Sequence, residues 1–183
     1  MEFWIQLNYM KTYIEIKVPI RYDAYWFESL RTVLHSVEVR WQKGFYHITM
    51  AFMDETVEGV DWKSILDRCF SRTTAFEMTF DKIDMFTSRP GNHIIHLTAT
   101  QAPTHFLSLV EALRNEMVNA GCKIQSGFKL HVTLGRARFP NMKLPTIREI
   151  INTIDLPKLS LTLTDVDFRV FMGPVIYETS LSK

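Results

Sequence analysis

Hydrophobic and polar side chains follow two different periods at the start of the chain. Residues 13–19, YIEIKVP, alternate strictly, with Ile14, Ile16 and Val18 on one face and polar side chains on the other. This period of two predicts a half-buried strand. Residues 21–37 instead repeat their apolar side chains at helical spacing, which predicts a helix.

The same patterns continue to the end of the chain, broken by glycine and proline turn signals. They predict strands at residues 39–41, 46–52, 75–86, 94–100, 130–136, 159–170 and 175–181, and helices at 60–70, 103–121 and 146–154. The order of elements in the first half recurs in the second, and nothing between the halves resembles a linker. We therefore expect one α+β domain over residues 1–183, with two pseudo-symmetric lobes of mostly antiparallel sheet and outer helices.

Composition narrows the class of protein. The 183 residues are 46% hydrophobic and 22% charged, which excludes disorder and a coiled coil. The net charge of +1 is too small for a protein that coats long nucleic acid by charge alone. We expect no membrane span, because no apolar run approaches about 18 residues. Because MEFWIQLN lacks signal-peptide features and Cys69 and Cys122 form no metal or disulfide motif, we expect a cytoplasmic protein with reduced thiols.

Candidate chemistry lies in two similar segments, HITMAF beginning at His47 and HVTLGR beginning at His131. Each is H-x-T, then an apolar residue, then a small one. Positions i and i+2 of a strand share a face, so Thr49 lies beside His47 and Thr133 beside His131. Because the motifs occupy matching places in the two halves, a pseudo-twofold axis would bring the imidazoles together across a central cleft.

A pair of imidazoles supplies one base and one acid near neutral pH. The threonine hydroxyls would donate hydrogen bonds to an anion between them. This layout suits in-line displacement at a phosphodiester without a metal. The motif alone leaves a second interpretation open, in which the two histidines are ordinary strand residues.

A third H-x-T, at His96 and Thr98, lacks the apolar and small residues that follow the other two. We expect His96 to be a partly exposed strand residue. His93, three residues away, would face the other side of the strand, so the two would not share a metal. His35 and His105 fall on predicted helices and are expected to have surface or satisfied polar roles.

Arg40-Trp41, HITMAF and the run GFKLHVTLGR at residues 127–136 together resemble the two-histidine phosphoesterase superfamily, in its branch of 2′-5′ RNA ligase-like proteins or RNA 2′,3′-cyclic phosphodiesterases. The resemblance covers nearly the whole chain, from the first strand to residues 166–181. It implies two lobes around a cleft, with His47 as proton donor and His131 as proton acceptor. Thr49 and Thr133 would hold the phosphate oxygens. Members open 2′,3′-cyclic phosphates to 2′-phosphates, and some join or cleave 2′-5′ linkages.

Two positions depart from this family's pattern. Met50 stands where leucine is common, and Glu15 stands where the family usually has a small residue. A carboxylate facing the cleft would repel an anionic substrate or alter its choice. A solvated glutamate on the outer face of the strand is the alternative, and both remain open at this point.

Basic residues gather near the second motif. The segment 121–148 contains six of them and no acidic residue: Lys123, Lys129, Arg136, Arg138, Lys143 and Arg148. This suits a short anionic ligand. Arg136 is a candidate substrate-binding residue through its place at the strand end, although its odd spacing from His131 would turn it away in a regular strand. Candidates for base stacking are Trp41, Phe45 and Phe139.

The sequence thus predicts a metal-independent phosphodiesterase, a monomer without cofactor, acting on RNA ends or small nucleotides with a 2′,3′-cyclic phosphate. Residues 87–92 and 139–145 would form loops that set specificity. One alternative is hydrolysis of another phosphodiester, such as 2′-5′ oligoadenylate or a cyclic ADP-ribose phosphate. Another is a catalytically idle module that binds nucleotides or RNA in the same cleft.

Overall fold

The computed structural model describes residues 10–57 and 59–182, and most of its strands form one antiparallel sheet. The main path of the sheet runs β11 (Val175–Ser180), β10 (Asp165–Val170), β1 (Thr12–Lys17), β3 (His47–Glu55), β8 (Val132–Arg138), β6 (Asn92–Thr98) and β5 (Lys82–Arg89). Two short strands pair beside this path, β2 (Glu38–Trp41) with β8 and β7 (Lys123–Ile124) with β3. A separate two-stranded sheet joins β4 (Phe76–Phe80) and β9 (Leu159–Leu163).

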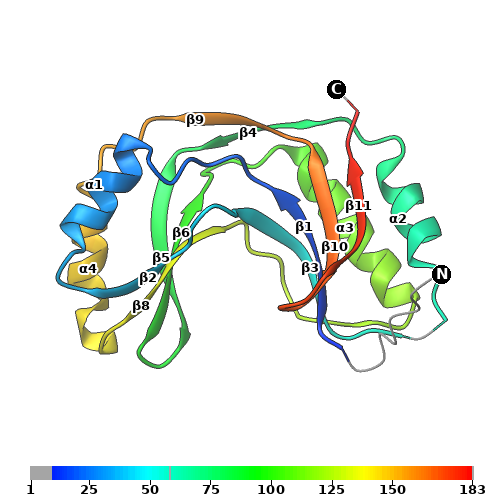
Figure 1. Cartoon of the computed structure of the whole chain (residues 1–183), viewed down its shortest axis with the longest axis horizontal. Helices are drawn as coiled ribbons and strands as arrows, with labels where there is room; N and C mark the ends of the chain where they lie inside the picture. Colours follow the sequence, from blue (N-terminus) through cyan, green and yellow to red (C-terminus); the bar gives the residue numbers. More distant parts are fainter. Residues whose placement is uncertain (1–9, 58, 183) are drawn as a thin grey trace.

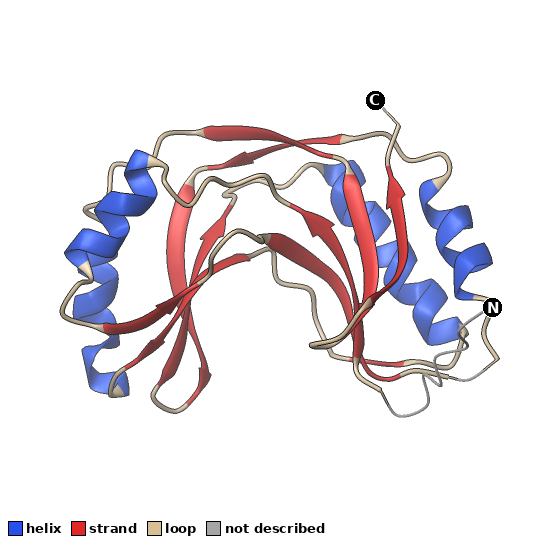
Figure 2. Cartoon of the chain, viewed as in Figure 1, coloured by secondary structure: helices blue, strands red, loops and turns tan. Residues whose placement is uncertain are grey.

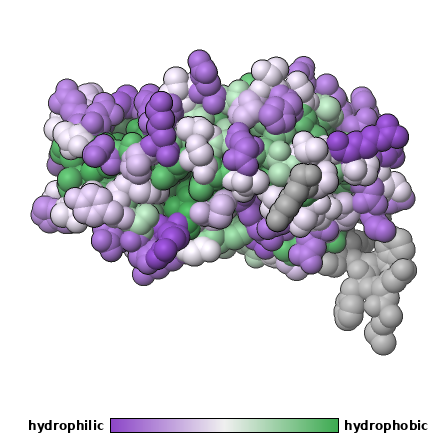
Figure 3. All heavy atoms as spheres, turned by 90° about the horizontal axis from the view of Figure 1, so that it is seen from above, coloured by the Kyte–Doolittle hydropathy of each residue, from purple (hydrophilic) through white to green (hydrophobic). Residues whose placement is uncertain are grey.

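The large sheet bends into an arch, and the helices lie outside it (Figure 1; Figure 2). The helices are α1 (Tyr25–Val33), α2 (Trp62–Phe70), α3 (Thr104–Asn119), α4 (Leu144–Ile151) and the 3₁₀ turn η1 (Asn141–Lys143). Helices α1 and α4 cover one side of the arch, α2 and α3 cover the other, and β4 with β9 crosses the top. From above, hydrophilic side chains mix with smaller apolar areas (Figure 3). The architecture confirms the α+β fold of two similar lobes.

The two lobes are interleaved along the chain. Strands β3 and β8 meet at the centre; β1 and β6 flank them, and β10 and β5 lie next outward. Short β7 and β2 are equivalent in the same way, since each adds to one end of a central strand. Helix α1 and strand β2 therefore belong to the lobe of β8, although they precede β3 in sequence. Each lobe thus combines elements from both halves of the chain.

The alternation that predicts β1 also defines the core, since Ile14 and Ile16 are fully buried. Two segments that are predicted as single strands each contain two strands. The segment 75–86 divides at Asp81, whose carboxylate accepts hydrogen bonds from the amide and the hydroxyl of Thr100. The segment 159–170 divides at Thr164, where the chain leaves the small sheet for the large one. Both sheets bury one face, so the alternation of apolar residues continues unchanged where the chain passes from one sheet to the other.

No helix of the described chain is long and apolar enough to cross a membrane.

Candidate active site

The two central strands bring both H-x-T motifs to one face of the sheet. β3 and β8 pair in antiparallel register at Ile48 and Val132, and both side chains are fully buried. The histidine and the threonine of each motif flank these residues in sequence, so they point to the opposite face, towards the inner side of the arch. The antiparallel register runs His47 towards Thr133, and Thr49 towards His131, so each histidine approaches the threonine of the other lobe.

A β-bulge follows each motif. Glu15 pairs with Thr49 while Ile14 pairs with Ala51, so Met50 is the extra residue in β3. In β8, Leu134 is the extra residue in the same place after Thr133. The bulge leaves two consecutive residues on the buried face, which explains the apolar and then small residues of the motif.

Arg136 lies beyond the second bulge, which reverses the expectation from its spacing. Because Leu134 is an extra residue, the exposed Arg136 returns to the face of Thr133. Gly135 is required on the buried face, since an added Cβ would lie 2.8 Å from the indole of Trp41. The guanidinium charge of Arg136 also contributes to lowering the pKa of both histidines. The expectation that a regular strand turns Arg136 away is therefore wrong, because the strand is not regular here.

The side chains beside the threonines differ between the lobes. In one lobe the register across the sheet runs Asp167, Glu15, Thr49, and in the other Asp84, His96, Thr133. Glu15 and His96 are thus equivalent by the pseudo-symmetry. Each lies next to a motif histidine, so the two motif histidines have chemically different neighbours.

His47 lies in an apolar and acidic environment. Its Nδ1 is 3.3 Å from Oε2 of Glu15, within ion-pair distance. The rings of Phe45 and Tyr13 lie 5.2 and 5.8 Å from the imidazole centroid. Burial lowers the pKa of His47 to about 4, and the positive charges of His131, Arg169 and Arg136 act in the same direction. At neutral pH the imidazole is therefore uncharged in the free protein.

Glu15 is completely buried, so the interpretation as a solvated glutamate is wrong. Its Oε1 lies 3.6 Å from Nε of Arg169, while the neighbouring Asp167 pairs with Lys17 at 3.0 Å. Burial raises the pKa of the Glu15 carboxyl to about 7; Asp167 adds to the increase, while Arg169 and Lys17 oppose it. Glu15 therefore exchanges its proton near neutral pH.

His131 has a simpler partner. Its Nδ1 lies 2.8 Å from the carbonyl oxygen of Lys129. A carbonyl oxygen only accepts hydrogen bonds, so Nδ1 carries the proton and the lone pair of the neutral ring is on Nε2. The Phe86 ring lies perpendicular to the imidazole, with the two centroids 5.3 Å apart. Burial lowers the pKa of His131, with further lowering by Lys129 and Arg136.

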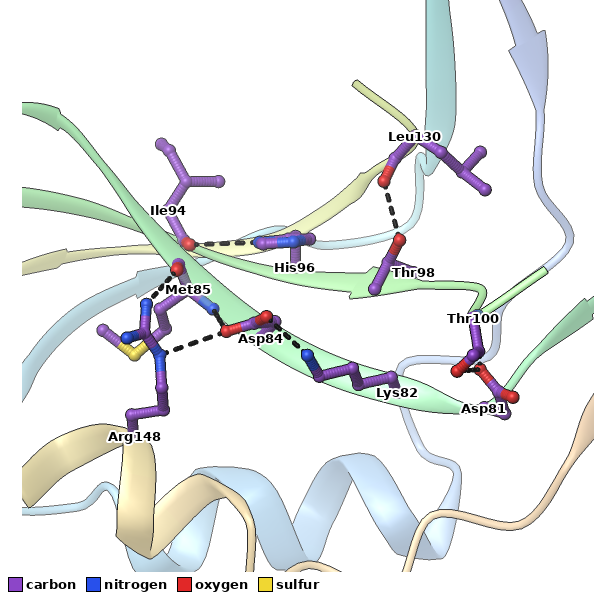
Figure 4. Close-up of polar contacts among 10 residues, drawn as sticks. All are labelled: Asp81, Lys82, Asp84, Met85, Ile94, His96, Thr98, Thr100, Leu130 and Arg148. Atoms are coloured by element: carbon purple, nitrogen blue, oxygen red, sulfur yellow. Dashed lines mark hydrogen bonds and ion pairs between the residues drawn. The ribbon is translucent and has the colours of Figure 1, made fainter. Parts of the chain in front are cut away.

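The third H-x-T has a structural use, visible in Figure 4. The Thr98 hydroxyl donates to the carbonyl oxygen of Leu130 at 2.7 Å, which fixes the chain just before His131. His96 is 2% exposed, so the expectation of partial exposure is wrong; its Nδ1 lies 3.4 Å from the carbonyl oxygen of Ile94. By contrast, the hydroxyls of Thr49 and Thr133 bond to no other group in the part of the chain that the structure describes.

Of the remaining histidines, His93 and His35 lie within hydrogen-bond distance of protein groups, and His105 stacks on Phe76. His93 lies between the Thr87 hydroxyl, at 3.1 Å, and the Phe139 carbonyl oxygen, at 3.0 Å. It faces away from His96, as expected. His35 is exposed, and its Nδ1 lies 2.9 Å from the carbonyl oxygen of Thr32. Among residues 10–57 and 59–182, no group of three or more His, Cys, Asp and Glu side chains is arranged to hold a metal ion.

Of the predicted stacking residues, only Phe45 lies against a motif histidine, and the Arg169 guanidinium lies 5.1 Å from its ring centroid. Phe139 stacks on His93, and Trp41 packs against the core. Three of the six basic residues of segment 121–148 are paired with acidic side chains. Lys123, Arg138 and Arg148 form ion pairs with Glu55, Glu38 and Asp84, at 3.6, 3.9 and 3.2 Å. Sequence reasoning missed Tyr13 and Phe86, which sit on strands other than the motif strands.

Comparison with solved structures identifies the class of fold. E. coli LigT in its apo form has a TM-score of 0.62 at 18% identity, covering 96% of this chain and 99% of LigT. Kluyveromyces marxianus Usb1 has a TM-score of 0.61 at 11% identity, covering 93% of this chain and 98% of Usb1. A structure described as a phosphoesterase has a TM-score of 0.61 at 18% identity, covering 95% and 99% of the two chains.

These neighbours define a two-lobed phosphoesterase fold. The model of the 2′-5′ RNA ligase superfamily matches residues 24–172, and the chain belongs to this superfamily of two-histidine phosphoesterases. The resemblance drawn from the motifs is confirmed. LigT has been crystallised with 3′-AMP, NADP⁺, ATP and phosphate. No curated protein matches the chain.

Proposed function

We propose that this chain is a metal-independent phosphodiesterase that opens 2′,3′-cyclic phosphates of RNA ends or small nucleotides to 2′-phosphates. One observation carries the proposal: the two central strands place two H-x-T pairs on the same face, with both threonine hydroxyls unused by the protein. The third H-x-T differs, because the protein itself uses the hydroxyl of Thr98. Free donors on either side of two imidazoles suit a bound phosphate.

The environments of the histidines support a division of roles. His131 directs Nδ1–H to a carbonyl and so has its lone pair on Nε2, which suits a general base. In the proposed step, Nε2 of His131 takes a proton from water, and the water oxygen attacks phosphorus. The bond from phosphorus to the 3′ oxygen breaks, and Nε2–H of His47 protonates that oxygen. The product is the 2′-phosphate.

Three further residues would hold the phosphate. The hydroxyls of Thr49 and Thr133 would donate to its non-bridging oxygens, and the Arg136 guanidinium would balance its charge from the same face of β8. The nearly neutral chain concentrates this positive charge locally, so we expect small or terminal nucleotide ligands rather than long duplexes. The nucleotide complexes of LigT support a nucleotide as ligand here.

Ligation would follow from the same geometry. If the 5′-hydroxyl of a second RNA end replaced water, the same attack would form a 2′-5′ linkage. Hydrolysis of a different 2′-linked or cyclic nucleotide uses the same residues and would be distinguished by substrate. A catalytically idle binding module is the other alternative, and the presence of both histidines and both free threonines argues against it. We further propose a cytoplasmic monomer.

The test is turnover by the purified chain of 2′,3′-cyclic mononucleotides and of RNA ends that carry a cyclic phosphate. Phosphorus NMR distinguishes the 2′-phosphate from the 3′-phosphate. We expect 2′-phosphate to form at the same rate with and without EDTA. Loss of turnover in EDTA would contradict the metal-independent mechanism, and formation of 3′-phosphate would contradict the assigned leaving oxygen. Binding without turnover of any cyclic nucleotide would favour the idle module.

A further inference from the structure

Buried polar atoms beside His47 lack hydrogen-bond partners. In the described part of the chain, both carboxyl oxygens of Glu15, Nδ1 of His47 and Nε of Arg169 are buried without a hydrogen bond. Most buried polar groups in proteins are paired, so such a group requires an explanation. The atoms lie within ion-pair distance of each other, at 3.3 Å for His47 to Glu15 and 3.6 Å for Glu15 to Arg169, but are not aligned as hydrogen bonds. Catalytic hydrogen bonds are often long before substrate binds and tighten in the complex.

We propose that Glu15 is a positioning residue that holds a proton for His47 and returns it during protonation of the leaving oxygen. This inference rests on the proposed function and assigns it a residue that the two motifs do not contain. A protonated Glu15 would donate to Nδ1 of His47, which leaves the hydrogen of the neutral ring on Nε2. His47 could then act as an acid without carrying a positive charge in the free protein.

The proton balance of the step is closed. Nε2 of His47 gives its proton to the leaving oxygen, while the carboxyl proton of Glu15 moves to Nδ1. Glu15 is then a carboxylate, His47 remains neutral, and His131 carries the proton taken from water. The site begins and ends with the same total charge. After product leaves, His131 loses its proton to solvent and Glu15 regains one.

The surroundings of Glu15 suit both of its states. Burial and the nearby Asp167 favour the protonated carboxyl, and they raise its pKa to about 7. Arg169 from β10 and Lys17 from β1 favour the carboxylate that forms in the step. Tyr13 also lies beside this group: burial raises the pKa of its phenol, and the charge of Glu15 acts in the same direction.

The opposite lobe lacks this device. His96 occupies the position equivalent to Glu15, and burial lowers its pKa to about 4. The partner of His131 at Nδ1 is a carbonyl oxygen, which has no proton to give. Only the His47 side of the described site therefore has a group that can supply a proton through Nδ1.

The decisive variant is Glu15→Gln, which keeps the size of the side chain but cannot release a proton in this step. On a 2′,3′-cyclic nucleotide we expect kcat/KM to fall by about 10- to 100-fold, a part of what general acid catalysis contributes. On a nitrophenyl diester of a nucleotide, whose leaving oxygen needs no proton, the change should stay within about threefold. The alkaline limb of the wild-type kcat/KM profile, expected near pH 7, should be absent from the variant.

Two carboxyl variants serve as matched controls. Asp167→Asn removes a buried negative charge next to Glu15 and should keep the alkaline limb but move it to lower pH, because Asp167 raises the pKa of Glu15. Asp84→Asn changes the equivalent position of the other lobe and should leave both the limb and the leaving-group preference as in the wild type.

A Glu15→Gln variant that loses rate equally on both substrates, with an unchanged pH profile, would overturn the inference and show a structural role. If instead the wild type turns over no cyclic nucleotide, the proposed function itself fails. If Glu15→Gln does not fold, long-range ¹H–¹⁵N spectra of the wild type test whether Glu15 exchanges a proton next to His47. The His47 nitrogen signals, assigned by their loss in His47→Asn, should shift between pH 6 and 8 as Glu15 titrates. Constant signals over that range would contradict the inference.

Discussion

The His47 side and the His131 side of the molecule share their strand geometry and differ in what surrounds each imidazole. Both sides have a central strand, a bulge after the threonine and a flanking strand in the same register. Beside His47 the flanking strand contributes a buried carboxyl, and beside His131 it contributes a second imidazole. Under the proposed function, the residues that the two lobes share would hold the phosphate, and the distinct roles of acid and base would come from the residues in which the lobes differ.

Removing either motif histidine is expected to have the largest effect. His47→Ala and His131→Ala should each lower kcat on a 2′,3′-cyclic nucleotide by about 10²–10⁴, the usual contribution of one proton-transfer group. His96→Asn should lose less than tenfold, because buried His96 lies on the neighbouring strand, with its ring centroid 5.9 Å from that of His131, and has no proton-transfer role in the proposed step. Steady-state kinetics of the three variants measure this. If His96→Asn were the most impaired of the three, the assignment of the catalytic pair would be wrong.

Removing one free hydroxyl should have the next largest effect. Thr49→Val and Thr133→Val keep the branched shape but delete a donor to the phosphate, and a donor to developing charge is commonly worth about 10²–10³ in rate. Thr98→Val is the matched control, because its hydroxyl bonds to Leu130. It should cost about 1 kcal/mol of stability and less than tenfold in rate. Wild-type kinetics in both motif variants would show that the hydroxyls point elsewhere.

Replacing Arg136 should produce a smaller effect on binding. Arg136→Gln is expected to raise KM about tenfold, in line with the loss of one charge-assisted hydrogen bond. It should also move the acidic limb of the pH profile to higher pH, since the Arg136 charge lowers the pKa of His131, the base. Arg138→Gln, which removes an exposed partner of Glu38, should change neither quantity. Equal effects of the two variants would exclude a specific role for Arg136.

The smallest effect concerns stability in acid. The pKa of His96 is lowered to about 4 in the folded protein, from an ordinary value of 6.5. The unfolded chain therefore binds a proton that the folded chain does not, and stability is lost as the pH falls from 6.5 towards 4. Because Asn does not titrate, the free energy of unfolding of His96→Asn, relative to that of the wild type, should be about 2 kcal/mol higher at pH 5 than at pH 7. Denaturant unfolding at the two pH values measures this, and an unchanged difference would show that His96 is protonated in the folded state.

The sequence predicts the strands that carry the two motifs better than it predicts the residues that surround the two histidines. Strict alternation predicts β1, and the repeated H-x-T pattern predicts that β3 and β8 lie together. The bulges at Met50 and Leu134 are not apparent from periodicity, so the orientation of Arg136 could not be deduced, although two successive nonpolar residues after each threonine are a usable signal. The burial of Glu15 depends on pairing with β10, about 150 residues later in the chain, and no local pattern reports such a contact.

The central claim is that His47 is the acid and His131 the base, and a change of leaving group tests it most directly. The measurement is kcat/KM of His47→Ala and His131→Ala on a 2′,3′-cyclic nucleotide and on a nitrophenyl diester of a nucleotide, each relative to the wild type. The account predicts that His47→Ala recovers most of its lost rate on the nitrophenyl substrate, because that leaving oxygen needs no proton. His131→Ala should stay impaired, since activation of water is still required. Equal recovery of both variants, or recovery of neither, would contradict the assignment.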